Sequence, residues 1–484
     1  MNWNWQHTLT AANHNSMSNI RKVLRRLVLS TIVALSVSAP QTCAAVSVDI
    51  SPIPSLTLAH ALAIATLHEG SIASAIANVR QAQSGKLAAI GTFLPSLSLS
   101  SQAQLYGPVG REGNTFIAGT QVSAQHSFYY NAITANLSEN LFDGGKDLAE
   151  FNAAKETISS AKSSLISVFN TTFSQIIQSY IAVANDQQTI IAQRHVVHME
   201  HQMAQLTYLR YQHSLFSRIT WLQSKQQELQ AETQLISDSQ QQIKDAKTLL
   251  RSIGYRRPPT LIMHVESLPP PPVVTRPPSN ISLNDPAIQS ALAQIHVAQE
   301  QVTEAKAGFW PKLSLVAQYN WLGVDLNKAS AAILDTKGSN YTFGLSLSIP
   351  LLPAVTTVAA VQSAQAQVQS RFGAYDNAWA DVSSRRMANW ANYEETEQQM
   401  QLALRTEHAA REALDLTIDR WKASQSNRLQ VYQAKITHIQ SVLAVALARN
   451  NLQLAQWEVF RAEHPLSFSR RILLAAQNEI SVTH

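Results

Sequence analysis

The sequence predicts a mixed α and β membrane protein, in which long coiled-coil helices join a transmembrane β-barrel that receives four strands from each chain. Three observations predict this fold class. Two stretches of over a hundred residues contain almost no Gly or Pro, two pairs of short segments alternate apolar and polar residues, and the whole pattern occurs twice in the chain. Together they indicate two internal repeats, each with one strand pair and one pair of long helices.

The overall composition fits a folded protein. The chain has 484 residues, of which 45% are hydrophobic and 14% are charged, against a usual charged share of about a quarter. At roughly 150 residues per domain, this length corresponds to about three domains. Collagen-like, low-complexity and charge-driven disordered classes are therefore excluded.

The net charge of +5 does not indicate nucleic-acid binding. Residues 1–45 hold Arg21, Lys22, Arg25 and Arg26 and no acid, so the remaining chain has 33 bases against 32 acids. A neutral body without a basic stripe lacks the charge that binds phosphate backbones.

Residues 1–45 are expected to be a signal peptide. Their basic cluster precedes the uncharged run Leu27–Ala39, and small residues follow up to Ala45, which is the usual order in a secretory signal. A membrane anchor is the alternative, but the run is too short to span about 30 Å of hydrocarbon. Met17 is a second candidate start, and lipidation of Cys43 stays open. Cleavage after Ala45 would leave no cysteine for disulfides, thiol catalysis or zinc.

The first repeat is expected at 46–254. Between Gly145 and Gly254 there is no Gly or Pro, and apolar residues recur in steps of three and four, which is coiled-coil spacing. An ordinary bundle core would show the same seam. The apolar residues are Leu165, Phe169, Phe173, Ile176, Tyr180, Val183 and Ile190. One helix from Lys146 to Gln212 would be about 100 Å long, which favours the coiled coil over a compact bundle.

A proline-rich linker is expected at 255–282, where eight of the 18 prolines fall. Such a segment is extended rather than folded. The second repeat follows at 283–463, again with only one Gly and no internal Pro between Pro353 and Pro465. Residues 464–484 form the C-terminal tail.

The two halves match residue by residue. Phe93, Pro95 and Leu97 correspond to Phe309, Pro311 and Leu313 at an offset of 216, whereas Arg210-Tyr211 corresponds to Arg420-Trp421 at an offset of 210. Six residues are therefore missing from the second copy. Surface loops at 108–132 and 324–340 are expected to absorb this difference.

Each repeat should contain one hairpin of strands of about nine to ten residues, apolar on one face and polar on the other. Transmembrane barrels use strands of this kind, with the apolar face to lipid and the polar face to a water-filled lumen, and a soluble sheet lying on a core is the alternative. Four strands cannot close a barrel, so several chains would have to combine. The lumen-facing positions are expected to be Ser98, Gln102, Asn136, Ser138, Ser314, Gln318, Ser346 and Ser348.

These residues resemble the TolC-like outer membrane efflux protein family over nearly the whole chain, from Ser55 to about Ala462. The resemblance rests on the two strand entries Phe93-Leu94-Pro95 and Phe309-Trp310-Pro311, on the strand return Leu141-Phe142-Asp143-Gly144-Gly145, and on the order helix, strand, strand, helix, helix, which occurs twice. The second strand return, which ends at Pro353, lacks the Asp-Gly-Gly.

The resemblance implies a homotrimer in the cell outer membrane that extends into the periplasm. Three chains would close a twelve-stranded barrel in outer membrane lipid, continuous with a coiled-coil barrel of twelve helices. Such a channel would passively conduct small molecules or secreted substrates that it receives from a periplasmic adaptor (membrane fusion) protein and an inner-membrane transporter. Which substrate and which class of pump it serves is not given by the sequence.

The resemblance also implies that the helix reversals near Ser214 and Ser424 form the periplasmic tip that docks on the adaptor. The family usually has Gly at both turns, and some members carry acidic rings where this chain has Gln430 and Gln433. Leu215 matches the apolar residue after the first turn. The other docking candidates are Arg210, Tyr211, Arg420 and Trp421, although these four could instead brace the helix ends and fill the bundle.

No catalytic constellation is present, so an enzyme is not expected. GxSxG, GxxxxGK[ST], dinucleotide-binding and HExxH patterns are absent. His195, His198 and His201 share one predicted helix, but they cannot all face one ion, so a solvated helix face without metal is expected, and no cofactor. The alternative function is an exported coiled-coil structural or adhesion protein of the cell envelope without a pore.

Overall fold

The computed structural model describes residues 55–106, 114–117, 120–123, 128–256, 264–265, 284–325, 332, 338–351 and 355–468. The chain divides into two units, Met1–Ile53 and Pro54–His484, and all described residues belong to the second. The elements of the first repeat are β1 (Ser55–Leu56), α2 (Leu58–His68), α3 (Gly70–Gly91), β2 (Ser96–Tyr106), β3 (Asn114–Ile117), β4 (Thr120–Ser123), β5 (Phe128–Phe142), α4 (Lys146–Gln212) and α5 (Arg218–Ser252). The remaining elements are β6 (His264–Val265), α6 (Pro286–Ala307), β7 (Lys312–Asp325), β8 (Gly338–Ser348), α8 (Val355–Lys422) and α9 (Arg428–Glu463).

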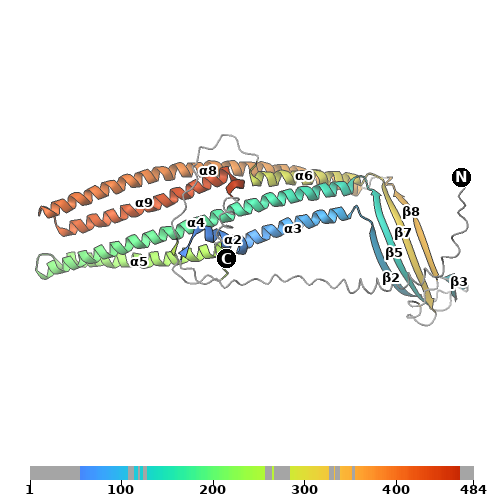
Figure 1. Ribbon diagram of the computed structural model, residues 1–484, viewed down its shortest axis with the longest axis horizontal. Coiled ribbons are helices and arrows are strands. Elements are labelled where there is room, and N and C mark those ends of the chain that lie inside the picture. Colours follow the sequence, from blue (N-terminus) through green and yellow to red (C-terminus); the bar gives the residue numbers. More distant parts are fainter. Residues whose placement is uncertain are drawn as a thin grey trace, which may run out of the picture. The chain divides into compact units, whose positions relative to one another are not determined.

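The long helices are continuous. α4 has 67 residues with the bounds that the sequence predicts, and α8 has 68. α4 packs along α5, and α8 packs along α9, as Figure 1 shows, while α9 also packs against α4. The predicted seam is buried from Phe173 to Ile190, whereas Leu165 and Phe169 are half-buried. The order of helices, strands and long helical pairs therefore occurs twice, as predicted.

The turn from β5 into α4 explains the Asp-Gly-Gly motif. Asp143 accepts hydrogen bonds from the backbone N–H groups of Gly145 (3.1 Å) and Asp147 (2.8 Å), so its carboxylate caps the start of α4. Gly144 has φ +77°, and a Cβ at this position would lie 2.6 Å from Cβ of Trp310. Only glycine fits there, because the first repeat's turn packs directly on the strand entry of the second repeat.

The four long strands form one antiparallel sheet in the order β2-β5-β7-β8, so the two hairpins lie side by side. The strands have 11 to 15 residues, longer than expected, and a bulge interrupts the β5-β7 register between Asn140 and Phe142. The region 108–132, expected to be a loop, contains the pair β3-β4 and the start of β5. Alternation therefore underestimated the strand lengths, since β2 and β5 continue through aromatic residues where the alternation ends.

The most densely buried part of the chain surrounds the middle of α4. There Phe173, Ile176 and Tyr180 are fully buried, and α2 packs against α4. The Tyr180 hydroxyl donates a 2.8 Å hydrogen bond to the backbone carbonyl of Leu56 in β1. This places the start of the first repeat on the midpoint of its longest helix.

Two segments contain structure that the sequence did not predict. The linker 255–282 contains β6, which pairs in parallel with β1, so it is not entirely without secondary structure. The tail 464–484 begins with an ordered segment, because Phe468 is 1% exposed and its ring contacts Trp457 and Phe460 of α9. The predicted signal peptide with Cys43, most of the linker and residues 469–484 lie outside the described residues.

Among the described residues, every helix is too short or too polar to cross a lipid bilayer.

Candidate functional site

The sheet separates polar from apolar side chains by register. Ser98 lies opposite Asn136, which lies opposite Gln318, which lies opposite Thr342, so one row of polar residues crosses all four strands. Directly opposed residues of neighbouring strands point to the same face. The same alternation brings all eight predicted strand positions to one face: Ser98, Gln102, Asn136, Ser138, Ser314, Gln318, Ser346 and Ser348.

Side-chain hydrogen bonds run across this polar face. Thr134 donates to Asn320 (2.8 Å), and Asn320 donates through Nδ2 to Oδ1 of Asn340 (2.7 Å). Ser96 and Ser138 share a hydrogen bond of 2.8 Å. The partners are uncharged, so the face is polar and neutral along most of its length. A neutral hydrogen-bonding surface can be wetted without holding a bound ion.

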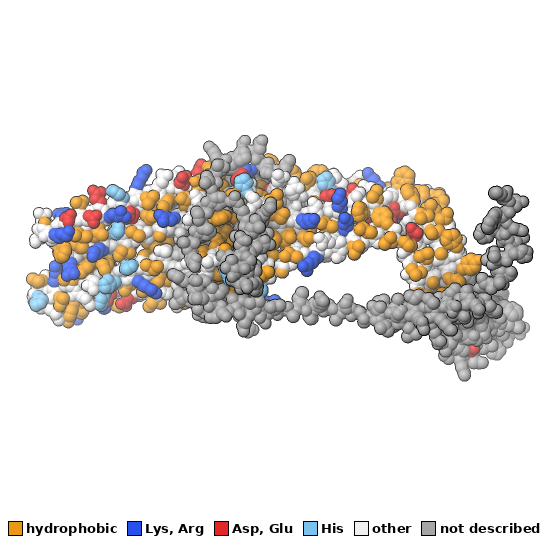
Figure 2. Space-filling view, in the orientation of Figure 1, with side chains coloured by type: hydrophobic (Ala, Val, Ile, Leu, Met, Phe, Trp, Pro, Cys, Tyr) orange, Lys and Arg blue, Asp and Glu red, His pale blue; other side chains and the backbone are white. Residues whose placement is uncertain are grey.

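The opposite face is apolar and uncovered. Leu97, Phe343 and Leu345 are 75%, 71% and 65% exposed, and Figure 2 shows hydrophobic side chains gathered over the strands. A soluble sheet would bury such a face on its own core, but here no part of the described chain covers these side chains. The face needs an apolar environment from outside the chain.

Both helix reversals have the same backbone. Ser214 and Ser424 have φ of 60° and 61°. After the first helix, the N–H of Leu215 donates to the carbonyl of Arg210 (2.8 Å), and after the second the N–H of Gln425 donates to that of Arg420 (2.8 Å). These bonds define Schellman turns. Serine in the left-handed region costs roughly 1 kcal/mol relative to glycine, so both turns hold a mild strain.

The side chains at the two turns differ. In the first repeat Tyr211 stacks on Trp221 (5.8 Å between ring centroids, 8° between planes), and Tyr208 also contacts Trp221. In the second repeat Trp421, the counterpart of Tyr211, is 42% exposed and has no ring contact within the described residues. The bracing role therefore fits Tyr211, whereas Trp421 is free to contact another molecule.

The remaining tip candidates are at the surface. Leu215 is 70% exposed, and Arg420, Gln430 and Gln433 are also exposed. Arg210 is half-buried, with its guanidinium 5.2 Å from the ring centroid of Phe216.

An ion-pair cluster joins α4 to α5 above the first turn. Glu228 is 2% exposed and contacts Nδ1 of His201 (2.7 Å) and Nζ of Lys225 (2.7 Å). Burial alone would raise the pKa of Glu228, but the hydrogen bonds from His201 and Lys225 lower it below its usual value. His201 is exposed, as expected for a solvated helix face, and it also forms this contact with Glu228, which the sequence did not predict. No group of three potential ligands that could hold a metal occurs within the described ranges.

A second cluster joins α8 to α9 at the matching height. Glu407 contacts Arg411 (2.5 Å) and Nε2 of His438 (3.2 Å). His438 follows Ser424 by as many residues as Glu228 follows Ser214, so the acid and the histidine have exchanged helices between the repeats. Each long hairpin is therefore tied across its two helices at a similar distance from its turn.

Further up the first hairpin, acids of α4 and α5 face each other. Burial, and then the carboxylates of Asp245 and Asp238, raise the pKa of Asp186 to about 7. Oδ2 of Asp186 is buried and has no hydrogen-bond partner within the described residues. Burial and the neighbouring carboxylates therefore favour the protonated form of Asp186.

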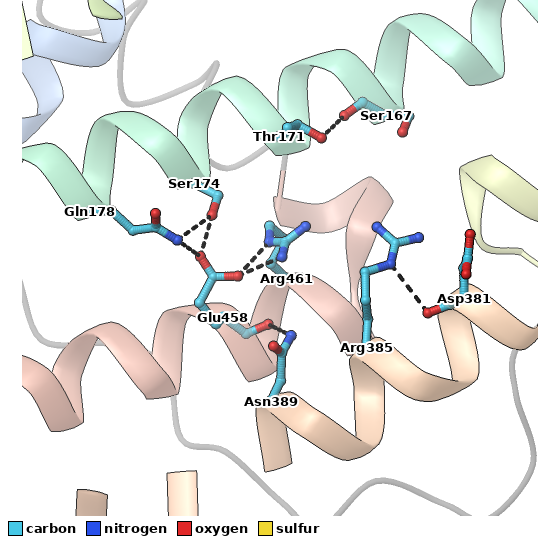
Figure 3. Close-up of polar contacts among 9 residues, drawn as sticks. All are labelled: Ser167, Thr171, Ser174, Gln178, Asp381, Arg385, Asn389, Glu458 and Arg461. Carbon is cyan, nitrogen blue, oxygen red and sulfur yellow. Dashed lines mark hydrogen bonds and ion pairs between the residues drawn. The ribbon is translucent and has the colours of Figure 1, made fainter. Parts of the chain in front are cut away.

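A polar junction that the sequence did not predict fixes α9 to α4 and α8 (Figure 3). Oε1 of Glu458 accepts hydrogen bonds from Ser174 and from Gln178 (3.3 Å) of α4, and its Oε2 accepts from both Nε and Nη2 of Arg461 (2.9 and 2.5 Å). Asn389 of α8 donates to the backbone carbonyl of Glu458 (3.3 Å). Arg461 lies only 3 residues from Glu458, but Ser174 lies 284 residues away in the chain. Because the contacts between helices join distant residues, no local motif predicts the junction.

Known proteins share this architecture. The family model described as outer membrane efflux protein matches residues 62–255 and 278–462. The fold is similar to that of outer membrane protein VceC from Vibrio cholerae (TM-score 0.67, 17% identity, 84% of this chain and 95% of that chain). It is also similar to the CmeC outer membrane channel of Campylobacter jejuni (TM-score 0.68, 15% identity, 87% and 89%). The search of curated proteins returned no match.

Proposed function

The chain belongs to the outer membrane efflux protein family, and on this premise we propose that it passively conducts small molecules or secreted substrates from a periplasmic adaptor and an inner-membrane pump to the exterior. The family is one of channels rather than enzymes, and its members lie in the outer membrane and extend into the periplasm. Such a role requires a closed pore, a surface that faces lipid and an end that receives substrate.

The four-stranded sheet with two unpaired edges carries the proposal. β2 and β8 each have one neighbour, and open strand edges are not tolerated in lipid. Three copies joined edge to edge would form a closed barrel of twelve strands. The polar face with Ser98, Gln318 and Ser346 would line the lumen, while the apolar face with Leu97 and Leu345 would meet lipid.

Unpartnered apolar residues on the helices support a trimer as well. On α5, Leu222, Leu229 and Ile236 are exposed at intervals of seven; on α8, Leu402 and Leu416 are exposed in the same way, with Ala409 between them. Leu222, Leu229 and Ile236 follow Ser214 by 8, 15 and 22 residues, and Leu416, Ala409 and Leu402 precede Ser424 by the same numbers. The two seams would therefore meet at equal heights between neighbouring copies.

A cysteine pair tests this contact in the protein without Cys43. Leu229→Cys with Ala409→Cys should form a disulfide between copies on mild oxidation and yield covalent trimers on a denaturing gel. Leu229→Cys with Ala423→Cys places the second thiol about 21 Å closer to the turn, directly after the end of α8, and is the matched control. Monomers only, in both double variants, would contradict the trimer.

The tip is proposed to dock on the adaptor. Leu215 is the most exposed apolar side chain of the first turn, and Trp421 is the exposed aromatic of the second; tryptophan is enriched among the residues that dominate protein contacts. Leu215→Glu should abolish export from cells while membrane-inserted trimers remain. Gln227→Glu, exposed on α5 but 13 residues from Ser214, should leave export unchanged.

The alternative function, an envelope coiled-coil or adhesion protein without a pore, explains the helices but not the sheet. Membrane fractionation separates the two. A trimer in the outer membrane that conducts ions in planar bilayers supports the channel, and a periplasmic protein without conductance supports the alternative.

A further inference from the structure

The two turns form a strongly basic end of the chain. Within six residues of Ser214 and of Ser424 there are five bases and one acid, giving a net charge of +4. The whole chain after residue 45 has a net charge of only +1. The end that holds the turns is therefore much more positive than the rest of the protein. The charged side chains are Arg210, Arg218, Arg420, Lys422, Arg428 and Asp419.

These charges are not neutralised within the chain. Asp419 pairs with Lys422 (3.2 Å). None of the four arginines forms an ion pair with a described carboxylate; Arg428 instead lies 5.5 Å from the ring centroid of Tyr432. Arg218, Arg420 and Arg428 are exposed, so their guanidinium groups remain available to solvent anions.

The layers beyond the tip do not reverse this charge. Glu412 and Asp415 on α8 are matched in number by Lys225 and Lys435, each 11 residues after its turn. Of the next acids, Glu228 and Glu407 are paired with bases, whereas one carboxylate oxygen of Glu200, 14 residues before Ser214, is buried without a hydrogen-bond partner within the described residues. On the polar face of the sheet, the register places Lys312 beside serines and amides and no acid among the described strand residues.

We propose that the channel selects anions at its periplasmic tip, so that its substrate class is negatively charged solutes. This inference rests on the proposed function, because it requires the tip to be the entrance of a conducting trimer. Three copies would bring twelve net positive charges around one opening. Charges of one sign lining a constriction concentrate counter-ions there by tenfold or more, and the Debye length of about 8 Å at physiological salt is long enough for neighbouring guanidinium groups to act together.

Ion selectivity in planar bilayers tests the proposal with the full protein. Under a KCl gradient the reversal potential should lie toward the chloride potential, with chloride about threefold or more as permeant as potassium. The preference for chloride should weaken in molar salt, where the Debye length falls to about 3 Å. The double variant Arg420→Glu with Arg428→Glu should shift the reversal potential toward that of potassium.

Arg80→Glu is the control for charge reversal at another site, since Arg80 is exposed on α3 and lies outside the coiled-coil hairpins; it should not change the reversal potential. A conducting protein that prefers potassium would overturn the anion proposal, and so would one whose selectivity is unchanged by the Arg420 and Arg428 substitutions. Neither result would contradict the proposed channel function. Absence of any conductance would instead count against the proposed function.

Discussion

The hydroxyl of Thr134 donates a 2.8 Å hydrogen bond to the side-chain carbonyl of Asn320, although 186 residues separate them. The bond joins the last strand of the first repeat to the first strand of the second, on the polar face of the sheet. The two repeats thus share one sheet rather than forming two. This arrangement makes the identity of each face testable by chemistry.

Cysteine labelling should separate the two faces. Ser98→Cys and Ser346→Cys should react with a membrane-impermeant thiol reagent, because the polar face is expected to line water. Leu97→Cys and Leu345→Cys should react at least tenfold less, since they would lie in hydrocarbon. The measurement is the labelled fraction of outer-membrane protein after a fixed time. Equal labelling of both pairs would rule out the barrel.

Arginine substitutions should affect membrane assembly by face. Leu345→Arg puts a cation on the lipid side, at about 2 to 4 kcal/mol per copy near the midplane, so trimers in the membrane fraction should fall sharply. Ser346→Arg, one residue along β8, is the control and should assemble much better. Similar amounts of trimer from both variants would mean that the faces are assigned incorrectly.

The two tip aromatics should have different roles. Tyr211→Ala removes a stacked pair with Trp221, worth about 1 kcal/mol, and should lower the thermal midpoint of the purified protein. Trp421→Ala removes an exposed ring and should leave the midpoint unchanged while reducing export. Both are measured by circular dichroism and an efflux assay in cells. A destabilised Trp421 variant with normal export would contradict the docking role.

Stability should depend on pH through Asp186. Its folded pKa of about 7 lies above the ordinary value of 3.8, so the folded state binds this proton more tightly than the unfolded chain. The contribution of Asp186 therefore becomes less favourable as pH rises from about 4 to about 7. Asp186→Asn should unfold a few degrees higher than the parent at pH 8 and at the same temperature at pH 4, after allowance for solvent screening.

Asp415→Asn, at an exposed site of α8, controls for the loss of a surface charge and should show no such pH-dependent gain. An Asp186 variant with the same unfolding temperature as the parent at every pH would mean that burial and the Asp245 carboxylate do not raise the pKa of Asp186 in solution.

The sequence predicted local features well and long-range contacts poorly. α4 could be bounded from Gly145 and the reversal near Ser214, because helix ends follow from nearby residues. The parallel pair of β1 with β6 and the burial of Phe468 could not be predicted, since their partners are distant in the chain. Glu458 was missed for the same reason: its role depends on side chains from three helices, whereas the strand positions followed a simple alternation.

The side-by-side hairpins also set the symmetry of the assembly. In a trimer, each chain would contribute two similar but unequal units to the ring, so six hairpins would alternate in kind under a threefold axis. A partner with six equal binding elements would then meet two chemically distinct positions, one presenting Leu215 and the other Trp421. Duplication within one gene thus permits two kinds of contact that a ring of six identical subunits could not offer.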